Sequence, residues 1–179
     1  MISRGGVALA VLSLITVASW SRQAAAADTP VALDLHYVAP TSKGADGGAG
    51  IAGRIGQRFV SKPWVITPEL QLAYETFGGT FEPRLYRGLG GLRVGYDIVA
   101  VRPGLYAHGG IARSAFDDIA APGLGHTAFT YDVGAFLDMT LLPLVNVGAH
   151  FAFNQMLDGN NGKDGVKWFA IGLHAELVL

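Results

Sequence analysis

The chain has 179 residues, half of them hydrophobic, and its 13 basic and 14 acidic side chains give a net charge of −1. This balance offers no basic surplus that would attract nucleic acid. Because the sequence contains no cysteine, it can form neither disulfide bonds nor thiolate metal sites, and it lacks the residue that anchors lipoproteins.

The first segment, residues 1–27, predicts a cleaved secretory signal peptide. Arg4 gives a short positive start, residues 5–20 form an apolar run, and four alanines at 24–27 offer a signal-peptidase site. The alternative is an uncleaved membrane anchor, for which the apolar run is short. We therefore expect a mature domain of residues 28–179, with 11 basic and 14 acidic side chains and a net charge of −3.

Eight segments of the mature chain alternate between apolar and polar or small residues, with the period of two that is typical of β-strands. They cover residues 31–39, 50–60, 68–77, 85–96, 101–112, 127–138, 145–154 and 166–179. The last is the clearest, since after Lys167 one face is wholly apolar and the other mixes small residues with His174 and Glu176. Proline cannot donate to a strand ladder, so we expect the third and fifth segments to begin near Pro68 and Pro103.

The connections between these segments alternate in length. Those near 41–48, 78–84, 113–126 and 157–165 are mostly longer and rich in Gly, Asp, Asn and Pro, whereas those near 61–64, 97–100 and 139–143 are short. Aromatic residues gather beside both kinds: Phe59, Trp64 and Tyr96 near the short turns, and Tyr37, Phe77, Tyr86, Phe129, Phe153 and Phe169 near the long loops. Long loops at one end, short turns at the other and two aromatic girdles are features of β-barrels in lipid.

The apolar C-terminal strand also favours a closed barrel, because an open sheet edge of this kind invites aggregation and a barrel has no edge. After residue 27 no stretch of about 18 residues lacks charged and turn residues, so a membrane-integral mature protein must be a barrel.

On these features the chain resembles the small eight-stranded outer-membrane barrels of Gram-negative bacteria, the OmpA/OmpX-like group. The resemblance covers the mature chain and rests on architecture. It implies an all-β fold, an eight-stranded antiparallel transmembrane up-and-down barrel, which is monomeric and surrounded by outer-membrane lipid. The chain departs from the group by ending on Leu179, where such proteins usually end on an aromatic residue.

Charged residues of both signs occupy the faces that we expect to point into the barrel. They are Asp34, Arg54, Arg58, Glu69, Glu75, Arg87, Arg93, Arg102, Asp132, Asp138 and Glu176. Eight strands leave an interior that side chains can just fill. Because an unpaired buried charge is very costly, we expect these residues to form a network of ion pairs that closes the lumen. The alternative is a narrow path for protons or ions through pairs that rearrange.

Three inward histidines form a second hypothesis. Counted from the ends of their strands, His36, His150 and His174 lie at similar heights on strands that become neighbours when the barrel closes. They could form a metal site or a cluster that gains protons near pH 6, although histidines in such places usually join hydrogen-bond networks. We expect no cofactor.

An enzyme of lipid A would need a serine beside a base. Ser114 with Asp117, Asp118 and His126 is the one local set of this kind in the sequence, and a solvated loop explains it better. We therefore expect a non-enzymatic barrel with a structural or surface-interaction role, exercised through loops 113–126 and 157–165. The alternatives are a narrow channel for ions or small solutes, a lipid-A-modifying enzyme and a soluble exported ligand-binding barrel.

Overall fold

The computed structural model describes residues 28–41, 46–78, 84–115, 127–157 and 166–179, and the predicted signal peptide lies outside them. These residues contain nine strands: β1 Pro30–Pro40, β2 Asp46–Gly56, β3 Phe59–Ser61, β4 Trp64–Gly78, β5 Arg84–Tyr96, β6 Val101–Ala115, β7 Thr127–Leu142, β8 Val145–Met156 and β9 Lys167–Val178. In this part of the chain no helix has the length and apolar character needed to span a membrane.

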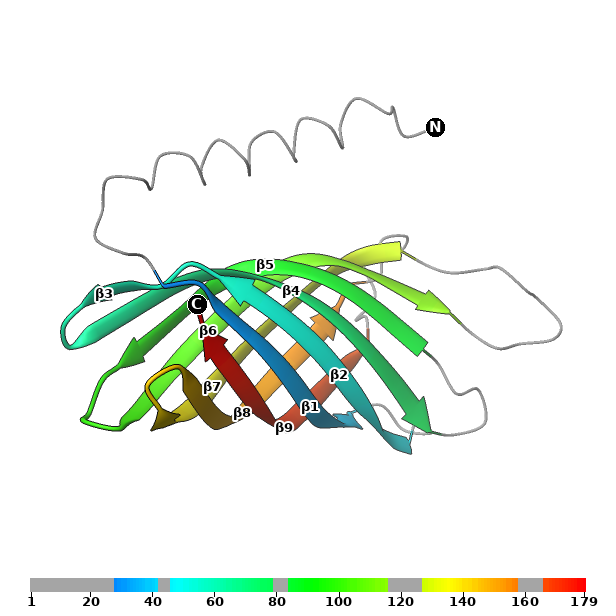
Figure 1. Ribbon diagram of the computed structural model, residues 1–179. Coiled ribbons are helices and arrows are strands. Elements are labelled where there is room, and N and C mark those ends of the chain that lie inside the picture. Colours follow the sequence, from blue (N-terminus) through cyan, green and yellow to red (C-terminus); the bar gives the residue numbers. More distant parts are fainter. Residues whose placement is uncertain (1–27, 42–45, 79–83, 116–126, 158–165) are drawn as a thin grey trace, which may run out of the picture.

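The strands form one closed antiparallel ring (Figure 1). Strand β1 closes it by pairing with β9, from Pro30 opposite Val178 to Pro40 opposite Trp168. Strands β2 and β3 pair one after the other with β4, so the nine strands fill eight positions. The predicted eight-stranded up-and-down barrel is confirmed, and closure leaves the apolar C-terminal strand without a free edge.

Short turns and both ends of the described chain lie at the same end of the barrel. The β3–β4, β5–β6 and β7–β8 turns consist of residues 62–63, 97–100 and 143–144. Thr29 and Leu179 exchange two backbone hydrogen bonds there, of 2.9 and 3.1 Å, and Figure 1 places the C-terminus beside the start of β1. The strand ends that flank the longer connections lie at the opposite end, and residues 42–45, 79–83, 116–126 and 158–165 of these connections are outside the described residues.

Strand β2 begins at Asp46, four residues earlier than predicted and within the predicted connection 41–48. Two further boundaries are wrong, and they share a cause. Segment 50–60 is not a single strand, because its pairing with β4 stops at Gly56 and resumes at Phe59. Strand β4 begins at Trp64, four residues before Pro68. The carbonyl of Pro68 accepts a hydrogen bond of 3.0 Å from the N–H of Gln57, within that interruption. In an antiparallel strand, the N–H and C=O of one residue point to the same side. Proline has no N–H, and the side on which Pro68 lacks this donor is the side of the interruption. The pairing of β4 with β5 is therefore intact.

The remaining strands match the prediction closely. Pro103 is the third residue of β6, as expected for a proline near a strand start. Strands β6, β7 and β8 run two to four residues further than predicted, to Ala115, Leu142 and Met156. Each extension continues the pairing with a neighbouring strand, which the alternation of single segments does not reveal.

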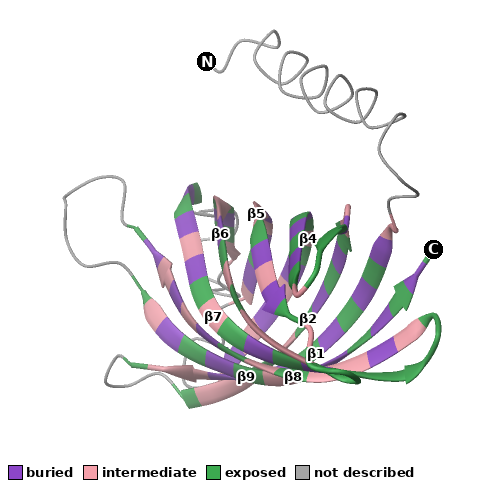
Figure 2. Ribbon diagram, turned by 90° about the vertical axis from the view of Figure 1, so that its left-hand side faces the viewer, coloured by how far each residue is buried: buried purple, intermediate pink, exposed green. Residues whose placement is uncertain are grey.

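Exposed and buried residues alternate along the strands, as Figure 2 shows by its stripes. The outward face is apolar: Leu72 is 75% exposed, Leu173 69% and Leu105 67%. The inward face holds the predicted charged residues, most of them buried. The barrel is therefore apolar outside and polar inside, the reverse of a water-soluble globular domain.

Aromatic side chains lie on the outer surface near both ends. Trp64 and Tyr96 form an edge-to-face pair with ring centres 5.1 Å apart at the short-turn end. Near the other end, Phe169 contacts Phe151 and Phe153. Phe77 departs from the predicted girdle: it is buried and packs edge-on against Trp168 inside the barrel, because it shares the inward register of Glu75.

An apolar layer fills the interior at the long-loop end. Its buried members are Val38, Phe77, Leu85, Ala112, Ala128, Ala152, Met156, Trp168 and Ala170. Trp168, the largest of them, has no exposed surface. The polar part of the lumen therefore lies between this layer and the short turns.

Candidate functional site

The candidate site is the polar interior of the barrel. All eleven charged residues predicted for it have side chains on the inward face; ten are buried, and Arg102 is half-buried. The structure brings them together in groups that follow one another from the apolar layer to the short turns.

Glu75 and Arg87 form the group beneath the apolar layer. Nη2 of Arg87 donates to Oε1 of Glu75 at 2.6 Å, and its Nη1 donates to Asp132 at 3.3 Å. The guanidinium of Arg87 also lies over the ring of Trp168, 5.2 Å from its centre. Nε2 of His36 lies 3.2 Å from Oε1 of Glu75, so the carboxylate with no exposed surface has two nitrogen partners.

His108 connects this group to the middle of the lumen. Its Nδ1 lies 2.7 Å from Oδ1 of Asp132 and its Nε2 lies 2.9 Å from Oε1 of Glu69. An ionised carboxylate only accepts hydrogen bonds, so both ring nitrogens must donate, and the ring is then the cationic form. His108 was not among the predicted network residues; its inward register beside Tyr106 on β6 is the sequence signal that could have included it.

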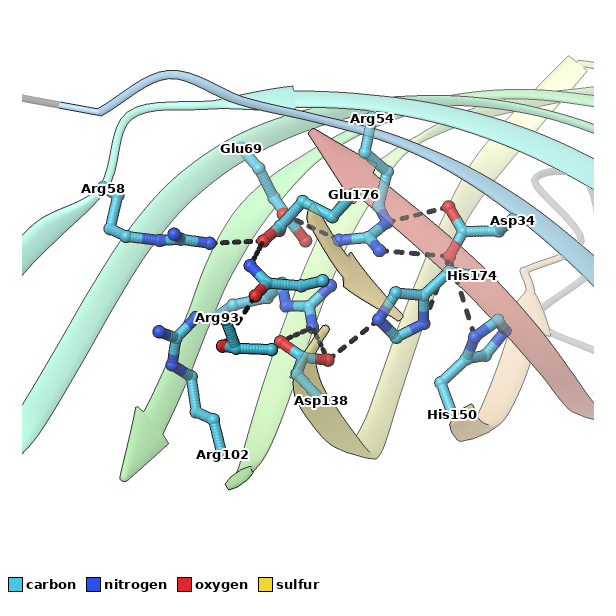
Figure 3. A network of polar contacts seen from close by, with 12 residues as sticks. Asp34, Arg54, Arg58, Glu69, Arg93, Arg102, Asp138, His150, His174 and Glu176 are labelled. Carbon is cyan, nitrogen blue, oxygen red and sulfur yellow. Dashed lines mark hydrogen bonds and ion pairs between the residues drawn. The ribbon is translucent and has the colours of Figure 1, made fainter. Parts of the chain in front are cut away.

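Arg54 is the centre of the middle group. It donates twice to Asp34, through Nε at 2.8 Å and Nη2 at 3.1 Å, and a third time to Glu69, through Nη1 at 3.1 Å. Figure 3 shows its guanidinium between the two carboxylates. This arrangement pairs one cation with two anions from strands β1 and β4.

The groups nearest the short turns combine ion pairs with neutral partners. Arg93 donates to Asp138 at 3.2 Å and lies over the ring of Phe136, 3.8 Å from its centre. Glu176 accepts hydrogen bonds from Arg58 and, at 2.7 Å, from the amide of Asn146. At the mouth, Arg102 donates to Asp97 at 2.6 Å. Asn146 and Asp97 were not predicted, because an amide carries no charge and Asp97 follows the end of its strand.

The three histidines of the predicted cluster are close but not equivalent. The ring centre of His150 lies 5.9 Å from that of His36 and 5.8 Å from that of His174. The set whose ligand-type atoms converge contains Asp34, His150 and His174, while His36 turns to Glu75. The pairing explains this difference: on β1, Asp34 rather than His36 lies opposite His174.

Little free volume remains between these side chains. A cavity of about 30 Å³ is lined by residues that include Asp34, Arg54, His108 and His150. A second cavity, of about 10 Å³, lies among Arg58, Arg93 and neighbouring side chains nearer the short turns. Since about 10–15 Å³ of such space holds one water molecule, the larger cavity has room for one or two.

The serine set considered for lipid-A chemistry is not brought together among the described residues. Ser114 is the second-last residue of β6, and Asp117, Asp118 and His126 lie outside the described ranges. The loops expected to contact partners, 113–126 and 157–165, likewise lie outside them apart from Arg113, Ser114, Ala115 and Leu157.

A closed ring of eight antiparallel positions, apolar outside and charged inside, defines the architecture of the small eight-stranded outer-membrane β-barrels. Solved structures agree. Neisserial surface protein A is similar with a TM-score of 0.68 and 16% identity, covering 83% of this chain and 96% of that one. Ail, the attachment invasion locus protein of Yersinia pestis, is similar with a TM-score of 0.62 and 12% identity, covering 86% and 99%.

The outer-membrane enzyme PagL shares the fold with a TM-score of 0.50 and 12% identity, covering 80% of this chain and 98% of that one. At these identities the likeness concerns the fold. No protein-family model matches the chain, and a search of curated proteins gives no match either.

Proposed function

We propose that the chain is an integral outer-membrane β-barrel, closed inside by packed side chains, with a structural or surface-interaction role. The observation that carries the proposal is the reversed distribution of polarity: large apolar side chains cover the outer wall, and paired charges fill the interior. In water this outer wall would expose far more apolar surface than a soluble monomer tolerates. In a bilayer the same wall faces hydrocarbon, and every strand still has its hydrogen-bonding neighbours.

The dimensions of the wall fit a membrane. Transmembrane strands need about 9–11 residues when tilted by about 45°. The eight barrel positions are filled by strands of 11 to 16 residues, with the short β3 continuing the position of β2. Outward aromatic residues near both ends, such as Trp64 and Phe169, would lie at the two interfaces.

The closed lumen is supported by two layers of packing. The apolar layer around Trp168 blocks the long-loop end, and the ion-pair groups fill the rest. A cavity of about 30 Å³ holds one or two water molecules, which is too little for a hydrated ion to pass. Conduction would require buried, hydrogen-bonded ion pairs such as Arg54–Asp34 to open and leave their charges uncompensated, which is unfavourable.

A closed barrel has no pore for transport, so its loops are the parts that can bind partners, and this favours a role at the cell surface. Two proteins with the same fold bear the names surface protein and attachment invasion locus protein. We assign the corresponding contacts of this chain to loops 113–126 and 157–165. We expect the signal peptide 1–27 to be removed before insertion and the mature barrel to be a monomer.

Fractionation and conductance test the proposal together. In a Gram-negative host we expect the protein in the outer-membrane fraction, extracted by detergent but not by salt or alkali, with its mature N-terminus at Asp28. The purified barrel in planar bilayers should give no steady conductance. Release without detergent would instead indicate a soluble exported barrel, and steady unitary currents would indicate the channel alternative.

The shared fold of an outer-membrane enzyme makes a catalytic role worth a separate measurement. We expect the mass spectrum of lipid A to be the same with and without expression of the chain. A new lipid-A species that disappears in Ser114→Ala would contradict the non-enzymatic role without affecting the proposed location.

A further inference from the structure

Three side chains from adjacent strands converge on the lumen wall: Asp34 from β1, His174 from β9 and His150 from β8. One ligand-type atom of each lies within 4.8 Å of the other two. Oδ1 of Asp34 lies 3.6 Å from Nδ1 of His150 and 3.9 Å from Nδ1 of His174 (Figure 3). Ligands bound to tetrahedral zinc at about 2.0–2.1 Å lie about 3.3 Å apart, so the two distances from Asp34 would shorten by about 0.3 and 0.6 Å, and the two imidazoles, within 4.8 Å of each other, by at most about 1.5 Å.

The hydrogen bond of His174 to Asp138 uses its Nε2 and leaves its Nδ1 without a partner among the described residues. Its Nε2 lies 2.8 Å from Oδ1 of Asp138, and because a carboxylate accepts, Nε2 carries the proton. When the ring is neutral, its Nδ1 carries a lone pair, and Oδ1 of Asp34, 3.9 Å away, is also an acceptor. The side chain of His174 has no exposed surface, and its Nδ1 has no hydrogen-bond partner among the described residues. Two facing buried acceptors are unfavourable unless a cation or a proton lies between them.

His150 approaches the same carboxylate oxygen of Asp34 from the next strand, with its Nδ1 at 3.6 Å. Its Nδ1 is also buried and without a hydrogen-bond partner in the described part of the chain. Glycines on neighbouring strands make room for both rings. A Cβ at Gly148 would lie 2.7 Å from Nε2 of His174, and a Cβ at Gly172 would lie 2.8 Å from Cε1 of His150.

The surrounding groups fit the outer shell of a metal site. Metal-binding histidines usually donate their other N–H to a carboxylate, as His174 does to Asp138. Oδ1 of Asp34 accepts a hydrogen bond of 3.1 Å from Arg54, and a carboxylate oxygen has a further lone pair for a metal. The cavity of about 30 Å³, which Asp34, Arg54 and His150 help to line, has space for a water molecule as the fourth ligand.

We propose that Asp34, His150 and His174 bind one divalent metal ion, with zinc as the best fit. Two imidazoles and one carboxylate are a donor set that zinc takes, with an open position for water. The ion would connect β1, β9 and β8 across the seam where the barrel closes. The site lies inside the proposed barrel but does not depend on its cellular role.

Titration of the purified full mature barrel in detergent micelles with ZnCl2 tests the site, with a chromophoric chelator as competitor. We expect one zinc per barrel. His150→Asn, His174→Asn and Asp34→Asn should each abolish stoichiometric binding, and Asp138→Asn should weaken it about 10- to 100-fold. His36→Asn is the matched control, since it removes a neighbouring inward imidazole that faces Glu75, and it should bind zinc like the wild type.

X-ray absorption of the zinc-loaded wild-type barrel gives a readout that needs no variant to fold. We expect two imidazole nitrogens and oxygen ligands at about 2.0–2.1 Å from the ion. A wild-type barrel without saturable zinc binding would overturn the proposal. Equal binding by the His150→Asn/His174→Asn double variant, loss of binding in His36→Asn, or a spectrum with oxygen ligands only would do the same.

Discussion

At the scale of single residues, Arg54 links side chains from three strands through its hydrogen bonds and those of its partner Glu69. Its guanidinium donates to Asp34 on β1 and to Glu69 on β4, and Glu69 in turn contacts His108 on β6. Removing one partner of a buried ion pair leaves the other charge without compensation, which typically costs about 3–5 kcal/mol. The effect of a substitution here should therefore exceed that of the same change at an accessible pair.

We predict that Arg54→Gln lowers the free energy of unfolding by about 3–5 kcal/mol. Arg102→Gln is the control: Arg102 pairs with Asp97 at the mouth, where solvent reaches both side chains, and its loss should cost about 1 kcal/mol or less. Urea unfolding of both variants in phospholipid vesicles measures the difference. Equal destabilisation by the two substitutions would show that burial does not govern the strength of these pairs.

The sequence predicts which residues point inward but not which ones meet. Alternation places Asp34 and Arg54 inside, yet on the ladder Arg54 lies opposite Ala32 and Asp34 lies opposite Ala52. Their contact is diagonal and depends on the register between β1 and β2. The same reason makes Asp34, rather than His36, the neighbour of His174. Counting residues from strand ends cannot give this offset, because strands in a barrel are staggered.

At the scale of strands, large inward side chains are paired with glycines on the adjacent strand. His174 lies opposite Gly148, His150 and His36 both lie opposite Gly172, and His108 lies opposite Gly91. A glycine leaves the space that an imidazole needs inside a narrow ring. The glycines of this chain are therefore part of its interior packing, at positions set by the strand register.

We expect Gly148→Ala to destabilise the barrel by about 1–3 kcal/mol, as overpacking of a filled interior does. The added Cβ would lie 2.5 Å from the carbonyl oxygen of Leu137 and 2.7 Å from the ring of His174. Gly53→Ala is the matched control, because nothing lies within 4 Å of its added Cβ, and it should change stability by no more than about 0.5 kcal/mol. Urea unfolding checks both; a neutral Gly148→Ala would contradict the packing role of this glycine.

Strand positions were predictable from alternation, but the continuation of β4 through Pro68 was not. A proline in a strand normally marks an end or an edge, and alternation alone cannot show that a neighbouring strand is interrupted beside it. Phe77 gave the opposite error: it lies near a strand end, but its parity with Glu75 places it inside. The alternation of inward and outward residues along β4 predicts the position of Phe77 correctly, whereas its closeness to a loop does not.

At the scale of the whole molecule, the outer wall should respond to charge according to depth. Leu72 lies at the middle of β4 and is 75% exposed, whereas Val99 lies in the β5–β6 turn. Arg at the bilayer midplane costs about 2–4 kcal/mol, and near the interface it costs about 0–1 kcal/mol. We therefore predict that Leu72→Arg reduces folding into vesicles strongly and that Val99→Arg does not.

Folding yields into phospholipid vesicles, followed by protection from protease, measure this prediction. Similar yields for Leu72→Arg and the wild type would count against lipid contact at the middle of the wall.

The overall architecture was predictable because it depends on features summed over many residues: eight alternating segments, alternating loop lengths and an apolar last strand. The interior network depends on individual contacts, and it needed the structure.

The apolar layer around Trp168 makes the interior different at the two ends of the barrel. Val38, Phe77 and Met156 complete a layer without ionisable groups at the long-loop end, while the short-turn end has Arg58, Glu176 and Arg102. Water, protons and metal ions cross a polar mouth far more readily than a layer of packed hydrocarbon. The interior should therefore equilibrate with the compartment beneath the membrane and stay insulated from the medium outside. A reagent added to one face of a reconstituted membrane would then reach Asp34 and His174 from the short-turn side alone.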